Sequence, residues 1–452
     1  VVDADCMYTN TGEGLHRFVD PVDGEVYLYS QFEVPDSRRM YTVFEQPDLK
    51  ATFRFTVTAP EQWAVVSNSP TPEPTRHGDG TATWAFVPTD RISSYITALV
   101  AGPYESTFSE LTSASGRVIP LGVYGRKSLW HHLDADYIFD KTREGFAYFE
   151  EKFNFPYPFA KYDQLFVPEF NAGAMENAGA VTFTETYVFR GKVTDAVKER
   201  RVVTILHELA HMWFGDLVTM KWWNDLWLNE SFAEWASTIA TAEATEWTEA
   251  WTTFNAMEKS WAYRQDQLPS THPVVATIND LEDVQVNFDG ITYAKGASAI
   301  RQLVAWVGEK EFLDGLRAYF DKNAYGNTRL ADLLGELETS SGRDLSSWTT
   351  EWLETSGVNL MRAEVEIDDE GRYSSVVIVQ EPPSQPEGVP HVLRSHRIAL
   401  GLYDEGASGL ERSRRVEIDV VGARTDVPEL VGVPAPGLLL LNDDDLTFTK
   451  IR

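Results

Sequence analysis

Cysteine is almost missing from this sequence, with Cys6 alone among 452 residues. An intramolecular disulfide is therefore impossible, which suits a reducing compartment, and we expect a cytoplasmic protein. Long hydrophobic runs are missing as well, because no window approaches 18 consecutive apolar residues, so no membrane span is predicted. Basic residues are few: 39 Lys and Arg stand against 69 Asp and Glu, a formal net charge of −30. Such a surface repels polyanions, so nucleic acid is excluded as an expected partner.

The first residues also lack the marks of a translation start or an export signal. The chain begins Val1-Val2-Asp3, without an initiator Met, a basic stretch or the apolar core of a signal peptide. We therefore expect the sequence to begin inside a longer chain, in what should be an incomplete N-terminal domain.

What is present is the composition of a folded globular protein. Apolar residues make up 43% of the chain, aromatic residues 12% and charged residues 24%, which excludes a disordered, collagen-like or coiled-coil chain. A chain of 452 residues is too long for one hydrophobic core. A domain size of about 150 residues suggests roughly three domains.

Residues 1–126 predict an N-terminal β-sheet domain. Short β-branched and aromatic runs alternate there with Pro, Gly and Asp punctuation, as expected for strands joined by turns. The expected strands are residues 26–30, 51–59, 63–68, 81–87 and 94–100.

Residues 127–357 predict an α+β domain, and residues 358–452 a β-sandwich, so the fold class is multidomain α+β. In the middle range apolar residues recur at helical spacing, and two expected strands interrupt the helices. The expected helices are residues 134–153, 196–214, 226–244, 292–307, 310–323 and 330–339, and the expected strands are 162–167 and 180–184. The last range contains strand patterns at residues 363–367, 373–380, 392–403 and 415–421.

The expected helix at 196–214 contains an HExxH motif, formed by His207, Glu208 and His211. Residues four apart share one helical face, so both imidazoles can converge on one cation while Glu208 lies beside them. This spacing is typical of zinc sites. The alternative is a helix whose two histidines are satisfied by hydrogen bonds in the core.

A hydrolytic zinc ion needs a third protein ligand, and Glu230 is the candidate. It begins the next expected helix, with 18 residues between it and His211, and this stretch holds Gly215 and a turn-like Asn-Asp pair that can reverse the chain. Alone, Glu230 would be interpreted as a solvated helix residue. Together with HExxH it completes the recurring His2Glu set. Glu234 lies one turn later and is either a residue that orients a ligand histidine or a plain surface carboxylate.

A second motif lies 34 residues before His207, the pentapeptide formed by Gly173, Ala174, Met175, Glu176 and Asn177. With both motifs the chain resembles the aminopeptidase N-like zinc metallopeptidases, gluzincins with the pattern HExxH, 18 residues and Glu. Further matches run from residues 31–33 and 44–48 to 293–296. The resemblance implies a bacterial member with a thermolysin-like α+β catalytic domain, one Zn2+ ion and peptide substrates that have a free N-terminus.

The same resemblance assigns roles to residues that would attract no notice alone. It implies that Glu208 is the general base and that Tyr293 donates its phenol proton to the tetrahedral oxyanion. It implies that Glu33 and Glu176 hold the substrate α-ammonium by charge-assisted hydrogen bonds, with help from Gln31. It places the substrate backbone against Gly173, a position without a Cβ atom, and the rest of the pentapeptide, Ala174, Met175 and Asn177, around it.

Three features depart from the family pattern. Ser231 stands where many members have Gly, but it lies outside the ligand set. Ala172 is small where some relatives carry Met, which would widen the pocket for the first substrate side chain. The chain also stops without the large C-terminal helical domain of full-length relatives, so we expect a fragment.

The sequence therefore predicts a zinc aminopeptidase, and three other functions stay open. A thermolysin-type endopeptidase would use the same zinc chemistry without needing a free substrate N-terminus. An epoxide hydrolase of the same family would use the same metal. A non-catalytic zinc-containing peptide-binding protein would have no use for Glu208 as a base or for Tyr293 as a donor.

Overall fold

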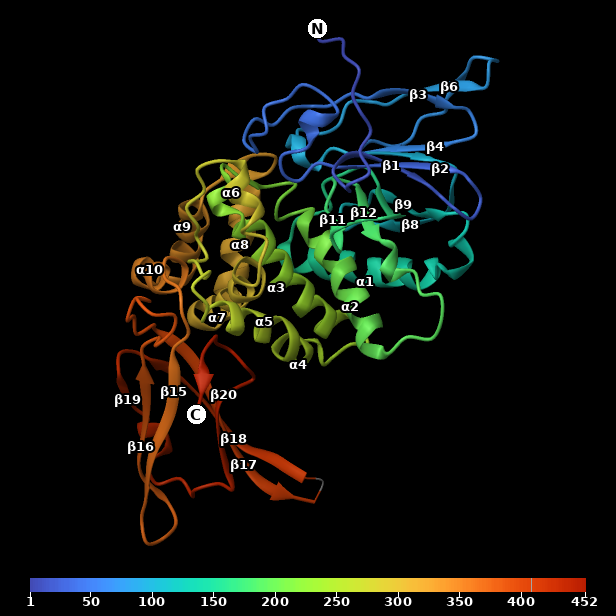
Figure 1. Cartoon of the computed structure of the whole chain (residues 1–452). Helices are drawn as coiled ribbons and strands as arrows, with labels where there is room; N and C mark the ends of the chain where they lie inside the picture. Colours follow the sequence, from blue (N-terminus) through green and yellow to red (C-terminus); the bar gives the residue numbers. More distant parts are fainter. Residues whose placement is uncertain (408) are drawn as a thin grey trace.

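The computed structural model describes residues 1–407 and 409–452 (Figure 1). Sheets form the end of the molecule that holds the N-terminus, helices fill the middle, and a second group of strands forms the other end (Figure 1). In these described ranges, no helix combines the length and the apolar character that a membrane span requires.

Two sheets make up the N-terminal part. A four-stranded sheet has the order β1-β2-β7-β4 and a three-stranded sheet the order β3-β6-β5. The bounds are β1 Gly14–Val19, β2 Val26–Gln31, β3 Thr56–Pro60, β4 Ala64–Ser67, β5 Thr75–Arg76, β6 Thr81–Ala85 and β7 Leu99–Gly102. Leu28, Val65, Trp84 and Phe86 share one apolar cluster, which joins the inner faces of the two sheets.

The expected strand at residues 94–100 is wrong in its first half. Ser94–Ile96 form a 3-10 helix, and the strand β7 begins only at Leu99. The reason is local hydrogen bonding, because the Thr97 hydroxyl donates to the Ser94 carbonyl at 2.8 Å and the Ser93 hydroxyl donates to the Pro47 carbonyl at 2.6 Å. Hydroxyl groups that bond to nearby backbone favour a turn over an extended strand.

A five-stranded mixed sheet with the order β11-β12-β10-β9-β8 follows. Its strands are β8 Tyr104–Thr112, β9 Val118–Arg126, β10 Tyr162–Val167, β11 Ala174–Met175 and β12 Ala180–Thr184. The central strands β9, β10 and β12 run parallel, and β10 and β12 are buried along their whole length, as is usual for inner strands of a parallel sheet. The short strand β11 leaves one edge of the sheet free. Strands β8 and β9 lie before the expected domain boundary at residue 126, and β10 to β12 lie after it, so this sheet crosses that boundary.

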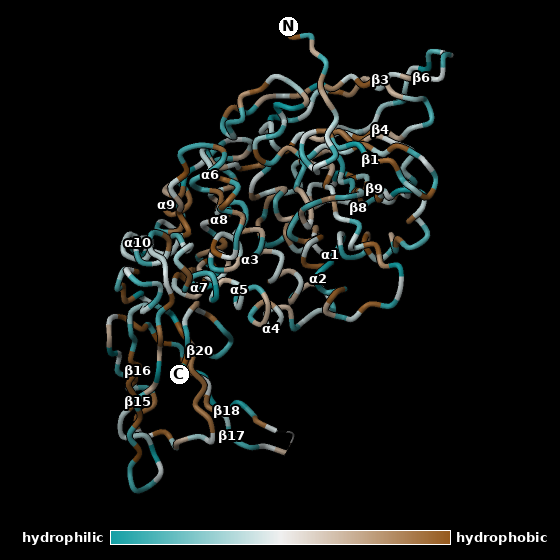
Figure 2. The backbone as a smooth tube through the Cα atoms, in the orientation of Figure 1, coloured by the Kyte–Doolittle hydropathy of each residue, from teal (hydrophilic) through white to brown (hydrophobic). Residues whose placement is uncertain are grey.

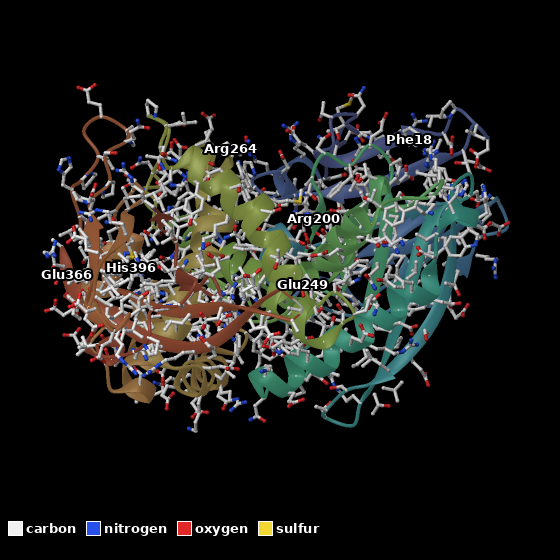
Figure 3. All side chains as sticks on the ribbon, turned by 90° about the horizontal axis from the view of Figure 1, so that it is seen from below. Phe18, Arg200, Glu249, Arg264, Glu366 and His396 are labelled. Atoms are coloured by element: carbon white, nitrogen blue, oxygen red, sulfur yellow. The ribbon has the colours of Figure 1, made fainter. Side chains whose placement is uncertain are left out.

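The helices pack on one another beside this sheet, and their cores merge into one large apolar cluster. The bounds are α1 Ala135–Phe153, α2 Asp195–His211, α3 Trp227–Ala244, α4 Ala250–Phe254, α5 Ser260–Gln265, α6 Leu281–Gln285, α7 Gly296–Val307, α8 Glu309–Asn323, α9 Leu330–Ser341 and α10 Ser346–Leu353. A short parallel pair, β13 Thr219–Met220 and β14 Asn327–Thr328, ties the loop after α2 to the segment before α9. Figure 3 shows this helical middle from below, with Arg200 of α2 near its centre.

The helix expected at residues 292–307 starts differently. Ile291–Lys295 form one π-helical turn, and the α-helix α7 begins only at Gly296. The Lys295 amide donates to the Gly290 carbonyl at 3.0 Å, which is the i to i−5 bond of a π-helix. Single π-turns of this kind occur often at functional sites.

The C-terminal part contains two further sheets, with the orders β19-β16-β15-β21 and β18-β17-β20. The bounds are β15 Leu360–Ile367, β16 Tyr373–Glu381, β17 His396–Gly406, β18 Gly409–Val420, β19 Arg424–Asp426, β20 Leu438–Asp443 and β21 Lys450–Ile451. Met361 and Ile378 of one sheet share an apolar cluster with Leu400 and Leu441 of the other. Hydrophobic stretches along these strands are visible in Figure 2.

Candidate active site

The two histidines of the HExxH motif project from the buried C-terminal half of α2. Ile205, Leu206 and Leu209 are completely buried and fix this half of the helix in the core. His207 Nε2 and His211 Nε2 lie 3.0 Å apart. The chain turns after Met212 through Gly215, whose φ of +124° suits a residue without Cβ, and returns as α3.

Glu230 comes from the first turn of α3 and completes a cluster of three donor atoms. Its Oε2 lies 3.3 Å from His207 Nε2 and 3.4 Å from His211 Nε2. The three side chains that the sequence proposed as ligands, His207, His211 and Glu230, therefore lie together in the fold, although Glu230 is 23 positions after His207.

The other ring nitrogen of each histidine has its own partner. His207 Nδ1 lies 3.2 Å from the Glu234 carboxylate, and His211 Nδ1 lies 2.9 Å from the Phe214 carbonyl. Because both partners are acceptors, each Nδ1 carries a proton, and loss of the second proton from either ring frees Nε2, the nitrogen that faces the cluster. Glu234 is only 4% exposed, so it is a buried partner of His207 and not a surface carboxylate.

The spacing of the three donor atoms fits zinc. Tetrahedral zinc with bonds of about 2.0–2.1 Å has neighbouring ligand atoms about 3.3 Å apart. The three observed separations, 3.0, 3.3 and 3.4 Å, lie close to this value. Two imidazoles with free lone pairs and one carboxylate are also the donor set of hydrolytic zinc sites with an open position. His207, His211 and Glu230 are therefore the residues that could hold the metal.

Burial and charge give the carboxylates beside this cluster different proton affinities. Burial raises the pKa of Glu208 to about 8, although His207 and His211 act in the opposite direction. Burial would also raise the pKa of Glu230, but the charge of His211 and hydrogen bonds from both histidines lower it to about 2. Glu230 therefore stays a carboxylate, the form that binds a cation, whereas Glu208 can take up and return a proton near neutral pH.

Glu33 and Glu176 lie next to the triad. One carboxylate oxygen of Glu33, one of Glu176 and one of Glu230 lie within 4.8 Å of one another. Among the described residues, Glu33 Oε1, Glu176 Oε1 and the Gln31 side-chain carbonyl are buried without a hydrogen-bond donor. Burial, first of all, raises the pKa of Glu33 and Glu176. Three unsatisfied acceptors in one place match the three donors of an ammonium group.

The pentapeptide at residues 173–177 lies at the free edge of the five-stranded sheet. Ala174 and Met175 form the edge strand β11, and Gly173 precedes it with its carbonyl accepting a hydrogen bond from the Thr184 amide at 3.0 Å. A Cβ atom at Gly173 would meet its nearest neighbour, the Tyr187 hydroxyl, only at 3.8 Å. The protein itself therefore leaves room for a side chain there, so any need for glycine must come from a bound molecule.

Two residues of the pentapeptide point away from the cavity beside the triad. The Asn177 amide donates to the Thr182 hydroxyl at 3.3 Å, and the Met175 sulfur accepts from the Gln31 amide at 3.3 Å. Both are buried and support the strand and Gln31, respectively.

Tyr293 faces the triad from the π-helical turn. Its ring stacks on the His207 ring, with centroids 6.0 Å apart and planes 28° apart. Burial, followed by the charges of Glu230 and Glu33, raises the pKa of the phenol well above its ordinary value. The hydroxyl therefore stays protonated and able to donate a hydrogen bond.

Two cavities meet at the triad. One of about 350 Å³ is lined by Gln31, Glu33, Glu176 and Phe288, among others, and one of about 200 Å³ by Gly173, Arg200 and Glu258, among others. His207, Glu208 and Tyr293 line both, so a chain passing from one cavity to the other would cross the metal triad. Ala172 also lines both cavities.

Sequence reasoning missed several residues that line these cavities. Arg200 was detectable, since it lies seven positions before His207 and therefore on the same face of α2. Its guanidinium pairs with Glu258 at 2.9 Å. Glu258 and Phe288 lie 47 and 77 residues beyond His211, and no local pattern marked them.

Comparison with known proteins agrees with this geometry. Residues 137–352 match the peptidase family M1 domain, and residues 6–96 match the peptidase M1 N-terminal domain. The chain belongs to peptidase family M1. An M1 relative, aminopeptidase N of Streptomyces lividans, is 63% identical over 454 aligned residues, which cover 99% of this chain and 52% of the relative.

More distant M1 relatives have similar names. Probable aminopeptidase 2 of Sulfurisphaera tokodaii is 35% identical, over 75% of this chain and 42% of its own length. Leucyl aminopeptidase of Saccharolobus solfataricus is 34% identical, over 76% of this chain and 43% of its own length. The chain thus spans about half the length, or less, of these M1 relatives.

Proposed function

We propose that this protein is a zinc-dependent aminopeptidase that hydrolyses the N-terminal bond of peptides. The observation that carries the proposal is the position of the unsatisfied Glu33 and Glu176 oxygens beside the His207, His211 and Glu230 triad. An ammonium group held by these two acids places the first peptide bond of a substrate at the triad. The names of the M1 relatives support the same activity.

The residues divide the reaction among them. One bound zinc ion, held by His207, His211 and Glu230, would supply a Lewis acid and lower the pKa of water to about 7. Glu208, which lines both cavities beside His207, takes a proton from the attacking water and passes it to the leaving amine. Tyr293 donates a hydrogen bond to the oxyanion that develops on the carbonyl oxygen.

The pockets on the two sides of the scissile bond receive different parts of the peptide. Glu33 and Glu176, with the Gln31 carbonyl, hold the α-ammonium, and the first side chain occupies the cavity of about 350 Å³. The free edge of β11, with Gly173 and Ala174, supports the peptide backbone. Met175 and Asn177 act indirectly, through Gln31 and the sheet.

We also propose a division into three domains. Residues 1–126 would form the N-terminal β domain, residues 127–357 a thermolysin-like catalytic domain and residues 358–452 a β-sandwich. The apolar cluster shared by the two C-terminal sheets supports the last of these. The first two are joined by the sheet of β8 to β12, so they would act as one body. A cytoplasmic location remains part of the proposal and is supported by the single, free Cys6.

Metal removal tests the catalytic proposal. A strong chelator should abolish hydrolysis of a leucyl or alanyl anilide, and added zinc should restore it. Glu208→Gln should keep stoichiometric zinc but lower kcat by about 10²–10⁴-fold, because general-base catalysis contributes on that order. Unchanged activity after chelation would overturn the metal mechanism. Stoichiometric zinc without turnover would instead indicate a peptide-binding protein.

Acetylating the substrate N-terminus tests the exopeptidase assignment. The acetylated peptide loses its charged contacts to Glu33 and Glu176, each worth about 1.5–3 kcal/mol, so kcat/KM should fall by about 10²–10⁴-fold. Glu176→Gln should remove much of this discrimination. Equal rates on free and acetylated peptides would identify an endopeptidase.

A further inference from the structure

Two residues at the C-terminal end of α5, Gln265 and Asp266, bind both ends of the π-helical turn that contains Tyr293. Tyr293 is the third residue of the turn Ile291–Lys295, and its hydroxyl can serve a reaction only if this turn holds the ring beside His207. The inference that follows rests on the proposed function, because it concerns how this donor is positioned.

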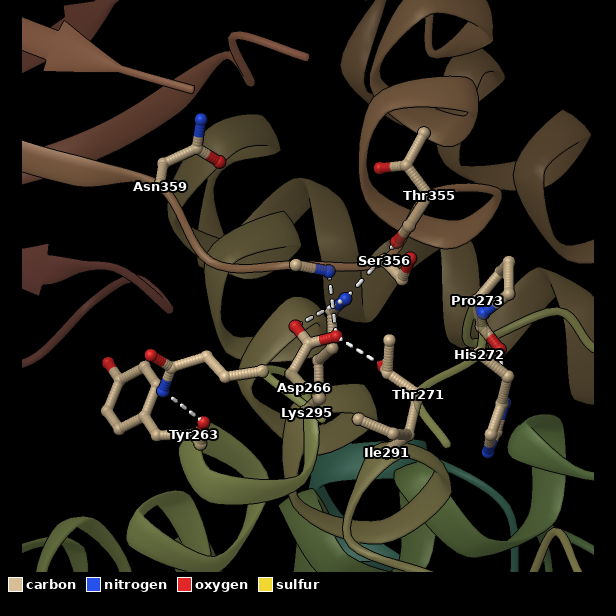
Figure 4. A network of polar contacts seen from close by, with 12 residues as sticks. Tyr263, Asp266, Thr271, His272, Pro273, Ile291, Lys295, Thr355, Ser356 and Asn359 are labelled. Atoms are coloured by element: carbon tan, nitrogen blue, oxygen red, sulfur yellow. Dashed lines mark hydrogen bonds and ion pairs between the residues drawn. The ribbon is translucent and has the colours of Figure 1, made fainter. Parts of the chain in front are cut away.

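The exit of the turn is fixed by a buried ion pair. Lys295 Nζ lies 2.8 Å from Asp266 Oδ2, and both side chains are completely buried (Figure 4). Asp266 Oδ1 also accepts hydrogen bonds from the Thr271 hydroxyl and the Gly357 amide, each at 2.7 Å. Asp266 directly follows α5. A buried lysine and aspartate paired in this way hold one geometry, because separating them would leave a charge in the core.

The N-terminal end of the turn is fixed by Gln265, the residue just before Asp266. Its side-chain carbonyl accepts from the Gly290 amide at 2.9 Å, and its amide donates to the Asp289 carboxylate. Asp289 Oδ1 in turn accepts from the amides of Ile291 and Thr292, at 2.9 and 3.1 Å. Two consecutive residues therefore hold the backbone on both sides of Tyr293.

The same ion pair reaches the junction with the C-terminal sheets. Lys295 Nζ donates to the Thr355 carbonyl at 3.2 Å, next to the Gly357 amide that Asp266 binds. The buried Arg394 binds the same segment, residues 355–357, and donates to the carbonyls of Ser356 and Gly357, at 3.1 and 2.8 Å. Arg394 precedes β17 of the C-terminal part. One continuous polar network thus runs from the C-terminal sheets to the turn that holds Tyr293.

We propose that the Lys295–Asp266 ion pair is a positioning element for Tyr293, and that the C-terminal sheets act on the reaction through it. Lys295 and Asp266 touch neither the metal triad nor the two cavities at it, so they do not act on substrate directly. Their effect on catalysis passes through the phenol of Tyr293. The expected effect is on the transition state, and substrate binding should change little.

Two variants and a double-mutant comparison test this proposal. Lys295→Met and Asp266→Asn should each lower kcat by about 10–100-fold, within the 10²–10³-fold that one oxyanion donor is worth, and change KM less than about threefold. In a Tyr293→Phe background neither should lower kcat further, because the donor they position is already gone. If Lys295→Met fails to fold, Asp266→Asn decides, since it keeps the side-chain volume and the Thr271 contact.

Lys259→Met is the matched control. Lys259 is equally buried at the same junction, where it pairs with Asp445 and donates to the Thr447 carbonyl, both at 2.6 Å. It should lose stability but keep kcat within about twofold. A folded Lys295→Met or Asp266→Asn variant with unchanged kcat would overturn the proposal, and so would losses that multiply with Tyr293→Phe. Failure of the proposed function is a different result, namely no zinc-dependent hydrolysis by the unmodified protein.

Discussion

Ser231 shows how one residue outside the ligand set can act on the site. It directly follows Glu230 in α3, is completely buried, and donates its hydroxyl to the Thr292 carbonyl at 2.6 Å. A Cβ atom at Gly296 would meet this hydroxyl at 2.0 Å, so serine at 231 requires glycine at 296. The sequence alone suggested that this departure from the family pattern was of little consequence. In the structure it joins the helix of a candidate ligand to the turn of Tyr293.

Replacing this hydroxyl should weaken both stability and turnover. Ser231→Ala removes one buried neutral hydrogen bond, so the free energy of unfolding should fall by about 1 kcal/mol and kcat by about 2–10-fold. Urea unfolding and steady-state kinetics measure the two effects. Ser237→Ala is the control, because Ser237 is equally buried in α3 but donates within its own helix, to the Glu234 carbonyl at 3.1 Å. Equal kcat losses in both variants would contradict a specific role for Ser231.

At the scale of elements, the entrance of the π-helical turn depends on a histidine that binds two acceptors. His272 Nε2 lies 2.7 Å from Asp289 Oδ2, and its Nδ1 lies 2.7 Å from the Pro273 carbonyl. Burial and the charge of Lys295 act to lower the pKa of His272, but the hydrogen bonds and the negative charge of Asp289 outweigh them and raise it. Folding therefore stabilises the imidazolium, in which both nitrogens donate, relative to the unfolded chain.

Stability should consequently depend on pH through His272. A pKa that is raised on folding contributes stability that is fully present below the unfolded value of about 6.5 and is lost as pH rises through the folded value. His272→Gln should thus lower the free energy of unfolding by about 1–2 kcal/mol at pH 5.5 and by less at pH 9. Urea titrations at both pH values measure the difference, with the exposed His77→Gln as control. A deficit that grows with pH would contradict this assignment.

Local sequence patterns predicted the long elements and the metal triad, and little of what supports them. The strands β10 and β12 have the expected bounds, and α3 begins within one residue of expectation. These elements were predictable because the spacing of apolar residues within a short stretch of sequence indicates a helix or a strand. The HExxH motif and Glu230 were detectable because helical spacing fixes their geometry. The π-turn was not, since Gln265 and Asp266 fix it by contacts with Gly290 and Lys295, which lie far from them in the sequence. The short helices α4, α5, α6 and α10 likewise depend on tertiary packing more than on local pattern.

At the scale of the whole molecule, the excess of acidic residues gives the protein a negative field that attracts positively charged molecules. The formal net charge is −30 at pH 7, from 39 Lys and Arg against 69 Asp and Glu. An aminoacyl anilide such as alanyl anilide has an α-ammonium and no carboxylate, so it approaches this field as a cation, and a field of one sign raises the encounter rate of the opposite charge.

Salt should therefore change activity according to substrate charge. Raising ionic strength from about 0.01 to about 0.5 M shortens the screening length from about 30 Å to under 10 Å, so long-range attraction is lost. For a lysyl anilide, with two positive charges, kcat/KM should fall by about 10-fold, and for an alanyl anilide by about 3-fold, whereas a glutamyl anilide should change least. The kcat values, which report the bound state, should vary little. Equal salt dependence of kcat/KM for all three substrates would show that the acidic surface only keeps the protein in solution, because steering by charge cannot act equally on substrates of different charge.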